Sequence, residues 1–191
     1  MCASFAKIVG RLRGVAEGLD KAVGMCYLDN MRIPRIYLET TIFNFPFADD
    51  APDLKAGTIR LFRAIEAGKF IPYTSQYVVD ELEDTKSAEK REKMKALIAD
   101  YGVETIPESK EAERLARIYV KEGIIKAKYE ADAIHIAMAT ITNLDFIISL
   151  NFQHIVKRKT IIETEIINAR EGYRRVYIYT PMEVIDYAEN T

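Results

Sequence analysis

Apolar residues along the chain follow two alternating patterns. Short runs of β-favouring residues predict strands, and the segments between them carry apolar residues at helical spacing. The predicted strands are residues 35–38, 70–74, 103–106, 145–150 and 176–180. The predicted helices are residues 54–69, a helix capped by Ser75 that runs through Leu82, and residues 87–101, 109–122, 129–143, 160–171 and 182–188. Strands that alternate with helices predict an α/β domain whose mostly parallel central sheet is covered on both faces.

The first 31 residues differ from the rest of the chain. Their apolar positions recur at helical spacing, but four glycines interrupt them, and glycine lowers helix stability. We therefore expect residues 1–31 to form a weakly helical or disordered extension. The compact domain is expected to span residues 32–191.

Composition narrows the class of protein. The chain has 191 residues, of which 49% are hydrophobic, and this is enough for a core and too much for a disordered chain. Lysine and arginine total 27 against 29 aspartate and glutamate, which excludes a globally basic nucleic-acid binder but not a local basic patch.

Cysteine usage and hydropathy indicate the compartment. Cys2 and Cys26 are the two cysteines, so a secreted scaffold held by disulfides is excluded. No apolar stretch approaches the ~20 residues that cross a bilayer, so we expect no membrane span. The expectation is a cytoplasmic protein.

Four polar residues are placed near the ends of predicted strands. Glu39 and Asn151 end strands, Glu81 lies on the helix after the second strand, and Asp132 begins a helix. In open α/β sheets, ligands bind beyond the carboxyl ends of the strands. Three carboxylates that meet at one sheet edge repel one another unless a cation neutralises them. Oxygen ligands without cysteine or clustered histidine favour Mg²⁺ or Mn²⁺.

Each residue also has an ordinary structural explanation. Glu81 can be an exposed helical glutamate, and Asp132 can simply favour a helix N-terminus. Asn151 can cap the turn that follows its strand. Glu39 is harder to explain in this way, because its surroundings are apolar.

Four segments carry a resemblance to a known family: YLETTIFN (37–44), SQYVVDELED (75–84), ADAIHIAMAT (131–140) and FIISLNFQHI (146–155). Together they resemble the PIN-domain family, small metal-dependent ribonucleases that include the toxins of VapBC toxin–antitoxin pairs. The resemblance implies a three-layer α/β/α sandwich with a mostly parallel central sheet. It also implies an Mg²⁺- or Mn²⁺-dependent endoribonuclease that hydrolyses RNA phosphodiester bonds, with a homodimer and an antitoxin protein as partners.

The resemblance assigns roles residue by residue. Glu39, Glu81 and Asp132 match the first three acids of the family, and these are the expected metal ligands. Asn151 stands where a fourth acid is common, and Thr40 matches a hydroxyl residue that holds a water at the metal.

Two positions depart from the family pattern. Glu39 is one methylene longer than the usual aspartate, and Asn151 carries no charge. The lost charge predicts one bound metal in the resting state. It also leaves an alternative open, namely a catalytically weak PIN-like protein that binds RNA or acts as a scaffold.

Basic residues follow the last candidate acid position. His154, Lys157, Arg158 and Lys159 are candidate contacts for the RNA backbone. An ordinary exposed charged segment explains them equally well.

Two further features are open to two explanations. His135 lies three residues after Asp132, so it can be a general base or a packed core residue. An apolar cluster, Phe43, Phe45, Pro46 and Phe47, follows the first strand. If it is exposed it marks a dimer or antitoxin surface, and if it is buried it is local core.

Overall fold

A computed structural model describes residues 32–190 of the chain. From Pro34 onward these residues form one compact unit. The predicted extension over residues 1–31 lies outside the described residues. No helix in residues 32–190 combines the length and apolarity that a membrane span requires.

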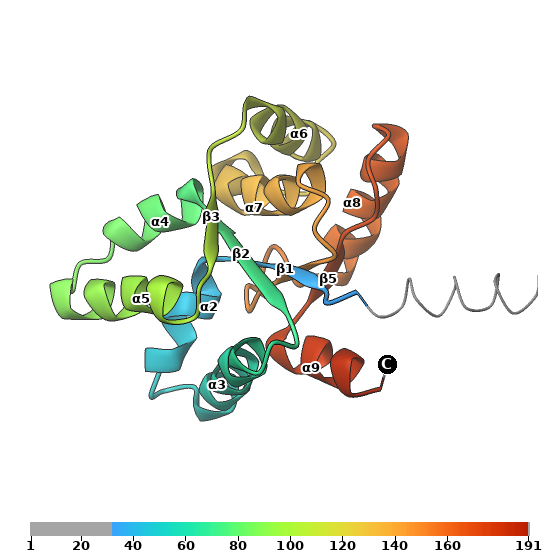
Figure 1. Cartoon of the computed structure of the whole chain (residues 1–191). Coiled ribbons are helices and arrows are strands. Elements are labelled where there is room, and N and C mark those ends of the chain that lie inside the picture. Colours follow the sequence, from blue (N-terminus) through green and yellow to red (C-terminus); the bar gives the residue numbers. More distant parts are fainter. Residues whose placement is uncertain (1–31, 191) are drawn as a thin grey trace, which may run out of the picture. The chain divides into compact units, whose positions relative to one another are not determined.

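Five parallel strands form the central sheet (Figure 1). They are β1 (Arg35–Leu38), β2 (Ile71–Ser75), β3 (Glu104–Ile106), β4 (Phe146–Ile148) and β5 (Tyr177–Tyr179). Their order is β3-β2-β1-β4-β5, so the chain winds outward from β1 in one direction and then continues from β4 in the other. The prediction of an α/β fold with a parallel sheet is confirmed.

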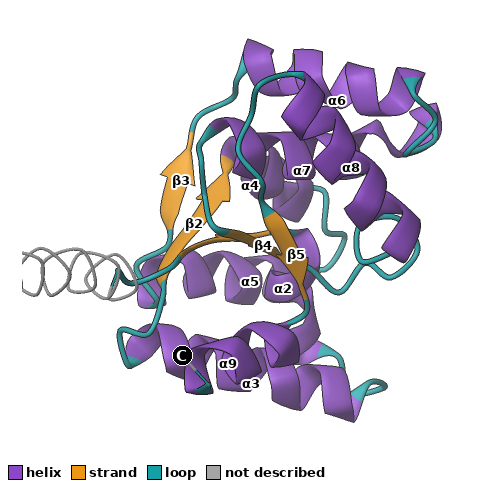
Figure 2. Ribbon diagram, turned by 90° about the vertical axis from the view of Figure 1, so that its right-hand side faces the viewer, coloured by secondary structure: helices purple, strands orange, loops and turns teal. Residues whose placement is uncertain are grey.

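The described residues contain eight α-helices and two 3₁₀-helices. The α-helices are α2 (Thr40–Asn44), α3 (Pro52–Glu66), α4 (Gln76–Glu83), α5 (Ala88–Asp100), α6 (Lys110–Lys121), α7 (Glu130–Ile141), α8 (Arg158–Arg170) and α9 (Pro181–Glu189). The 3₁₀-helices are η1 (Phe45–Phe47) and η2 (Ala127–Tyr129). In Figure 2, α6, α7 and α8 lie on one side of the sheet, and α3, α5 and α9 lie on the other. This arrangement is compatible with the expected three-layer sandwich.

The centre of the sheet is the most buried part of the fold. All three residues of β4 are buried, and Ile36, Tyr37 and Leu38 of β1 are fully inaccessible to solvent. Burial on both faces is typical of a parallel strand between two helical layers. Because β1 separates the two winding directions, its carboxyl end lies at the point where open α/β sheets bind ligands.

The segment after β1 differs from the sequence-based expectation. Residues 40–44 form the helix α2 where no helix was predicted, and the 3₁₀-helix η1 follows it directly. Phe43 is fully buried, and its ring centroid lies 6.2 Å from that of Phe62 in α3. Phe45 and Phe47 are partly buried against the core. The apolar cluster is therefore local core, which was one of its two explanations.

Candidate functional site

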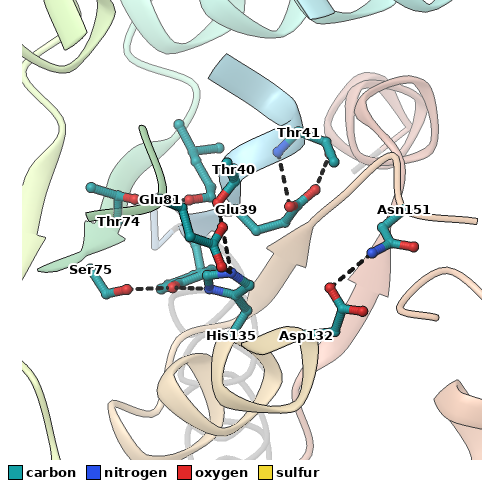
Figure 3. A network of polar contacts seen from close by, with 11 residues as sticks. Glu39, Thr40, Thr41, Thr74, Ser75, Glu81, Asp132, His135 and Asn151 are labelled. Atoms are coloured by element: carbon teal, nitrogen blue, oxygen red, sulfur yellow. Dashed lines mark hydrogen bonds and ion pairs between the residues drawn. The ribbon is translucent and has the colours of Figure 1, made fainter. Parts of the chain in front are cut away.

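The four candidate acid and amide residues come from four separate elements at the carboxyl ends of β1, β2 and β4. Glu39 follows β1 directly, and Glu81 lies in α4, the helix after β2. Asp132 lies in the first turn of α7, and Asn151 lies in the loop three residues beyond β4. Because β2 and β4 flank β1 in the sheet, these elements meet at one edge (Figure 3).

His135 lies among the three carboxylates. Its side chain is almost inaccessible to solvent, and its Nε2 atom is 3.3 Å from both carboxylate oxygens of Glu81. Burial acts to lower the pKa of the His135 imidazole. The hydrogen bond to Glu81 and the negative charges of Glu81, Glu39 and Asp132 outweigh burial and raise that pKa above its ordinary value. His135 is therefore a buried core residue whose ring contacts the Glu81 carboxylate and whose pKa the charges of Glu39 and Asp132 also raise.

Glu39 is held by hydrogen bonds from the chain itself. Its carboxylate is the N-cap of α2, where it accepts the backbone N–H of Thr41 at 2.9 Å and the Thr41 hydroxyl. It also accepts the backbone N–H of Leu150 at 3.3 Å. Burial raises the pKa of this carboxyl, although His135 and Thr41 act to lower it. With 2% of its surface exposed, Glu39 is the least accessible of the three acids.

Glu81 is more open. Its side chain is 34% exposed, and it accepts the hydroxyl of Thr40 in addition to its contact with His135. Burial acts to raise the pKa of Glu81, but the hydrogen bonds from His135 and Thr40 and the charge of His135 outweigh burial and lower it. Glu81 is therefore ionised near neutral pH. Thr40, which the resemblance assigns to water positioning, contacts this carboxylate directly.

Asp132 and Asn151 form the second open part of the site. The Asn151 amide donates from Nδ2 to Oδ1 of Asp132 at 2.9 Å, and its Oδ1 accepts the backbone N–H of His154 at 3.0 Å. The contact with His154 is the turn-capping explanation of Asn151, and it leaves the amide donor for the acid. Burial raises the pKa of Asp132, although the charges of His135 and His154 act to lower it.

Two further residues of the site were not singled out by the sequence. Tyr37 in β1 is within hydrogen-bond distance of His135 Nδ1 (3.0 Å) and of the Ser75 hydroxyl (2.6 Å). Ser75 was predicted to cap a helix, and it does occupy the N-cap position of α4, but its side chain makes no capping hydrogen bond. A signal for Tyr37 exists in hindsight, because it is a hydroxyl-bearing residue in an aliphatic strand, two positions before Glu39.

Of the candidate substrate contacts, His154 adjoins this cluster, because its backbone N–H donates to Asn151. His154 stacks on Tyr129 with ring centroids 3.7 Å apart, and its backbone holds Asn151. The three residues at the start of α8 are exposed: Lys157, Arg158 and Lys159. Lys159 lies 3.6 Å from Glu163, one turn later in α8.

The donor set is of the kind that Mg²⁺ and Mn²⁺ prefer, because it consists of carboxylate oxygens. Within residues 32–190, however, no three His, Cys, Asp or Glu side chains are arranged as a metal-binding group. Glu81 and Asp132 are partly exposed and fit a divalent cation best. Glu39 fits least well, because it is buried and already accepts three donors.

No protein-family model matches the chain, and no curated protein is similar to it at a significant level. The resemblance to the PIN-domain family therefore stays a prediction from the sequence motifs.

Proposed function

We propose that the chain is a PIN-type, metal-dependent endoribonuclease that hydrolyses RNA phosphodiester bonds. One observation carries the proposal. Glu39, Glu81 and Asp132 come from distant segments, and their elements meet at the carboxyl edge of a parallel sheet, where the buried His135 ring contacts Glu81 and the Asn151 amide donates to Asp132 (Figure 3). A fold gathers acids in this way at a cost, because like charges repel one another, and such clusters are typical of functional sites.

The proposed cofactor is Mg²⁺ or Mn²⁺, which Glu81 and Asp132 would hold together with Glu39. When bound, such an ion neutralises charge on a phosphate and lowers the pKa of a bound water. The requirement for a divalent ion follows from the proposal and from the oxygen donors of the site.

The chain's own residues then divide the remaining work. Asn151 donates to Oδ1 of Asp132 and so would fix the orientation of this carboxylate toward the ion. Thr40 and His135 fix the orientation of Glu81. Such positioning is what a phosphoryl-transfer site needs from its protein, because no covalent nucleophile takes part.

The basic residues complete the proposed site. His154, Lys157, Arg158 and Lys159 lie beyond Asn151 and would contact the backbone phosphates of the RNA. By its resemblance to the PIN-domain family, we further propose that the protein is a cytoplasmic toxin that forms a homodimer and binds an antitoxin protein.

The test is the substitution Asp132→Asn, which keeps the size of the side chain and removes its charge. We expect it to abolish Mn²⁺ binding, measured by isothermal titration calorimetry, and to lower cleavage of a single-stranded RNA by at least about 100-fold. Glu130→Gln is the matched control, because Glu130 is an exposed acid in the same helical turn. Full cleavage by the Asp132→Asn protein would contradict the proposal.

A second candidate function is RNA binding or scaffolding with little catalysis. One observation favours this candidate. Each of the three carboxylates already accepts a hydrogen bond from the chain, so the acids are stabilised without a metal ion. RNA binding that persists in EDTA, together with no cleavage in Mn²⁺, would favour this candidate.

A further inference from the structure

A chain of hydrogen bonds runs from the interior of the sheet to Glu81. It begins at the Ser75 hydroxyl, passes through the Tyr37 hydroxyl and His135, and ends at the Glu81 carboxylate, with successive distances of 2.6, 3.0 and 3.3 Å. Ser75 and Tyr37 are fully buried, and His135 is 2% exposed. These three residues come from β2, β1 and α7, so it is the tertiary structure that brings them together.

The direction of the last link is fixed by chemistry. An ionised carboxylate only accepts hydrogen bonds, so His135 Nε2 must carry a proton and donate it to Glu81. Nδ1 is then free to donate or to accept. The Tyr37 hydroxyl can either accept a hydrogen bond from Nδ1 or donate one to it. In both cases the Ser75 hydroxyl can take the complementary role toward Tyr37.

The position of Ser75 supports a specific role for its hydrogen bond to Tyr37. Serine at an N-cap ordinarily accepts a backbone N–H of the helix, and this contact stabilises the helix. Ser75 occupies the N-cap of α4 and makes no such bond, because its hydroxyl contacts Tyr37 instead. A local rule broken in this way at a buried site is typical of a functional constraint.

We propose that Tyr37 and Ser75 are positioning residues that hold the His135 ring with Nε2–H directed at Glu81, and that this orientation sets the position of the Glu81 carboxylate in the site. The orientation of the ring does not depend on the function proposed above. Its consequence for metal binding rests on that proposed function.

The test compares two buried tyrosines. Tyr37→Phe removes the hydroxyl next to His135, and Tyr119→Phe removes a hydroxyl that donates to Asn168 away from the site. Both side chains are fully buried, so the two variants lose similar packing and hydrogen bonding. Ser75→Ala removes only the first link and serves as a second variant if Tyr37→Phe fails to fold.

Two measurements follow. The first is the exchange rate of the His135 Nε2 proton with solvent, observed by NMR; the chain has two histidines, and His154→Gln identifies the other signal. The second is the dissociation constant of Mn²⁺. We expect Tyr37→Phe to speed exchange by about tenfold and to weaken Mn²⁺ binding by about tenfold, the lower end of the range for groups that orient a metal ligand. Ser75→Ala should change both in the same direction by less.

The outcomes separate the two proposals. Exchange in Tyr37→Phe that matches Tyr119→Phe would overturn the positioning role, and so would an unchanged Mn²⁺ affinity in a protein that binds the ion. If the unsubstituted protein binds no Mn²⁺, the proposed function fails, and proton exchange alone then decides the positioning role.

Discussion

The side-chain amide of Asn151 is held at both ends. Its Oδ1 accepts the His154 N–H, so its Nδ2 faces Asp132 and donates to it. A carbonyl oxygen turned away in this manner cannot ligate an ion beside Asp132 unless the turn at His154 opens. Asn151 therefore stabilises the negative charge of Asp132 through a hydrogen bond.

The substitution Asn151→Asp tests the role of the Asn151–Asp132 hydrogen bond. It replaces the donor with a second carboxylate that faces Asp132. Loss of a hydrogen bond to a charged group should lower the free energy of unfolding by about 1.5–3 kcal/mol without metal, measured by urea denaturation. The added charge should at the same time tighten Mn²⁺ binding, because carboxylates close together favour a bound cation.

Gln153→Glu is the matched control for that exchange. It makes the same change from amide to carboxylate two residues later, at an exposed position of the same loop. We expect a change in stability within about 0.5 kcal/mol. Equal stability loss in the two variants would mean that the Asn151–Asp132 contact contributes nothing.

The sequence predicted the acidic residues of the site but not the residues that hold them in place. Glu39, Glu81 and Asp132 could be selected because their joint placement predicted one sheet edge, and the elements that carry them do meet there. Tyr37 stands out as a hydroxyl-bearing residue in an aliphatic strand, but its role could not be predicted, because its partners Ser75 and His135 lie 38 and 98 positions away. His135 had two explanations, and the structure combines them.

At the scale of elements, hydrophobic periodicity located every strand within a few residues. Strand β1 matches its prediction at both ends, and β4 is shorter than predicted, since only residues 146–148 pair in the ladder. Helix α2 escaped prediction because it has five residues and no amphipathic period, and because its cap is a glutamate. Nucleation of such a short helix depends on tertiary contacts rather than on its own sequence.

The packing of α3 against α9 offers an element-scale prediction. A Cβ atom added at Gly57 in α3 would lie 3.3 Å from Cγ of Met182 and 3.4 Å from its Sδ. Met182 is 38% exposed, so its flexible side chain can move by a few tenths of an ångström. Gly57→Ala should therefore raise the free energy of unfolding by about 0.5–1 kcal/mol through helix propensity, as measured in urea.

Gly68→Ala is the contrasting substitution. Gly68 ends the same helix with a φ of +72°, in the left-handed region that a Cβ disfavours. We expect a loss of about 1–2 kcal/mol there. If Gly57→Ala destabilised the protein as much as Gly68→Ala, the contact with Met182 would be rigid rather than adaptable.

On the scale of the whole molecule, sheet topology explains why distant acids meet. The order β3-β2-β1-β4-β5 places β1 between the strands that lead to Glu81 and Asn151. Alternating strands and helices predict a parallel sheet, and a parallel sheet brings all carboxyl ends to one edge. The sequence does not reveal the strand order, so it could not predict that His135 in α7 would contact Glu81 in α4.

The hydrogen bonds that the chain donates to the three carboxylates lead to a prediction about the stability of the fold without metal. Each carboxylate has a partner from the chain, so EDTA should leave the far-ultraviolet circular dichroism spectrum and the melting temperature unchanged. An ion that binds only the folded protein stabilises it by mass action. At about 100 times its dissociation constant, Mn²⁺ should raise the melting temperature by about 5–10 °C for a domain of this size, and Asp132→Asn should remove the shift. Unfolding by EDTA would identify a structural metal instead, and a melting temperature that Mn²⁺ does not change would favour the scaffold over the nuclease, because a catalytic ion must bind before it can act.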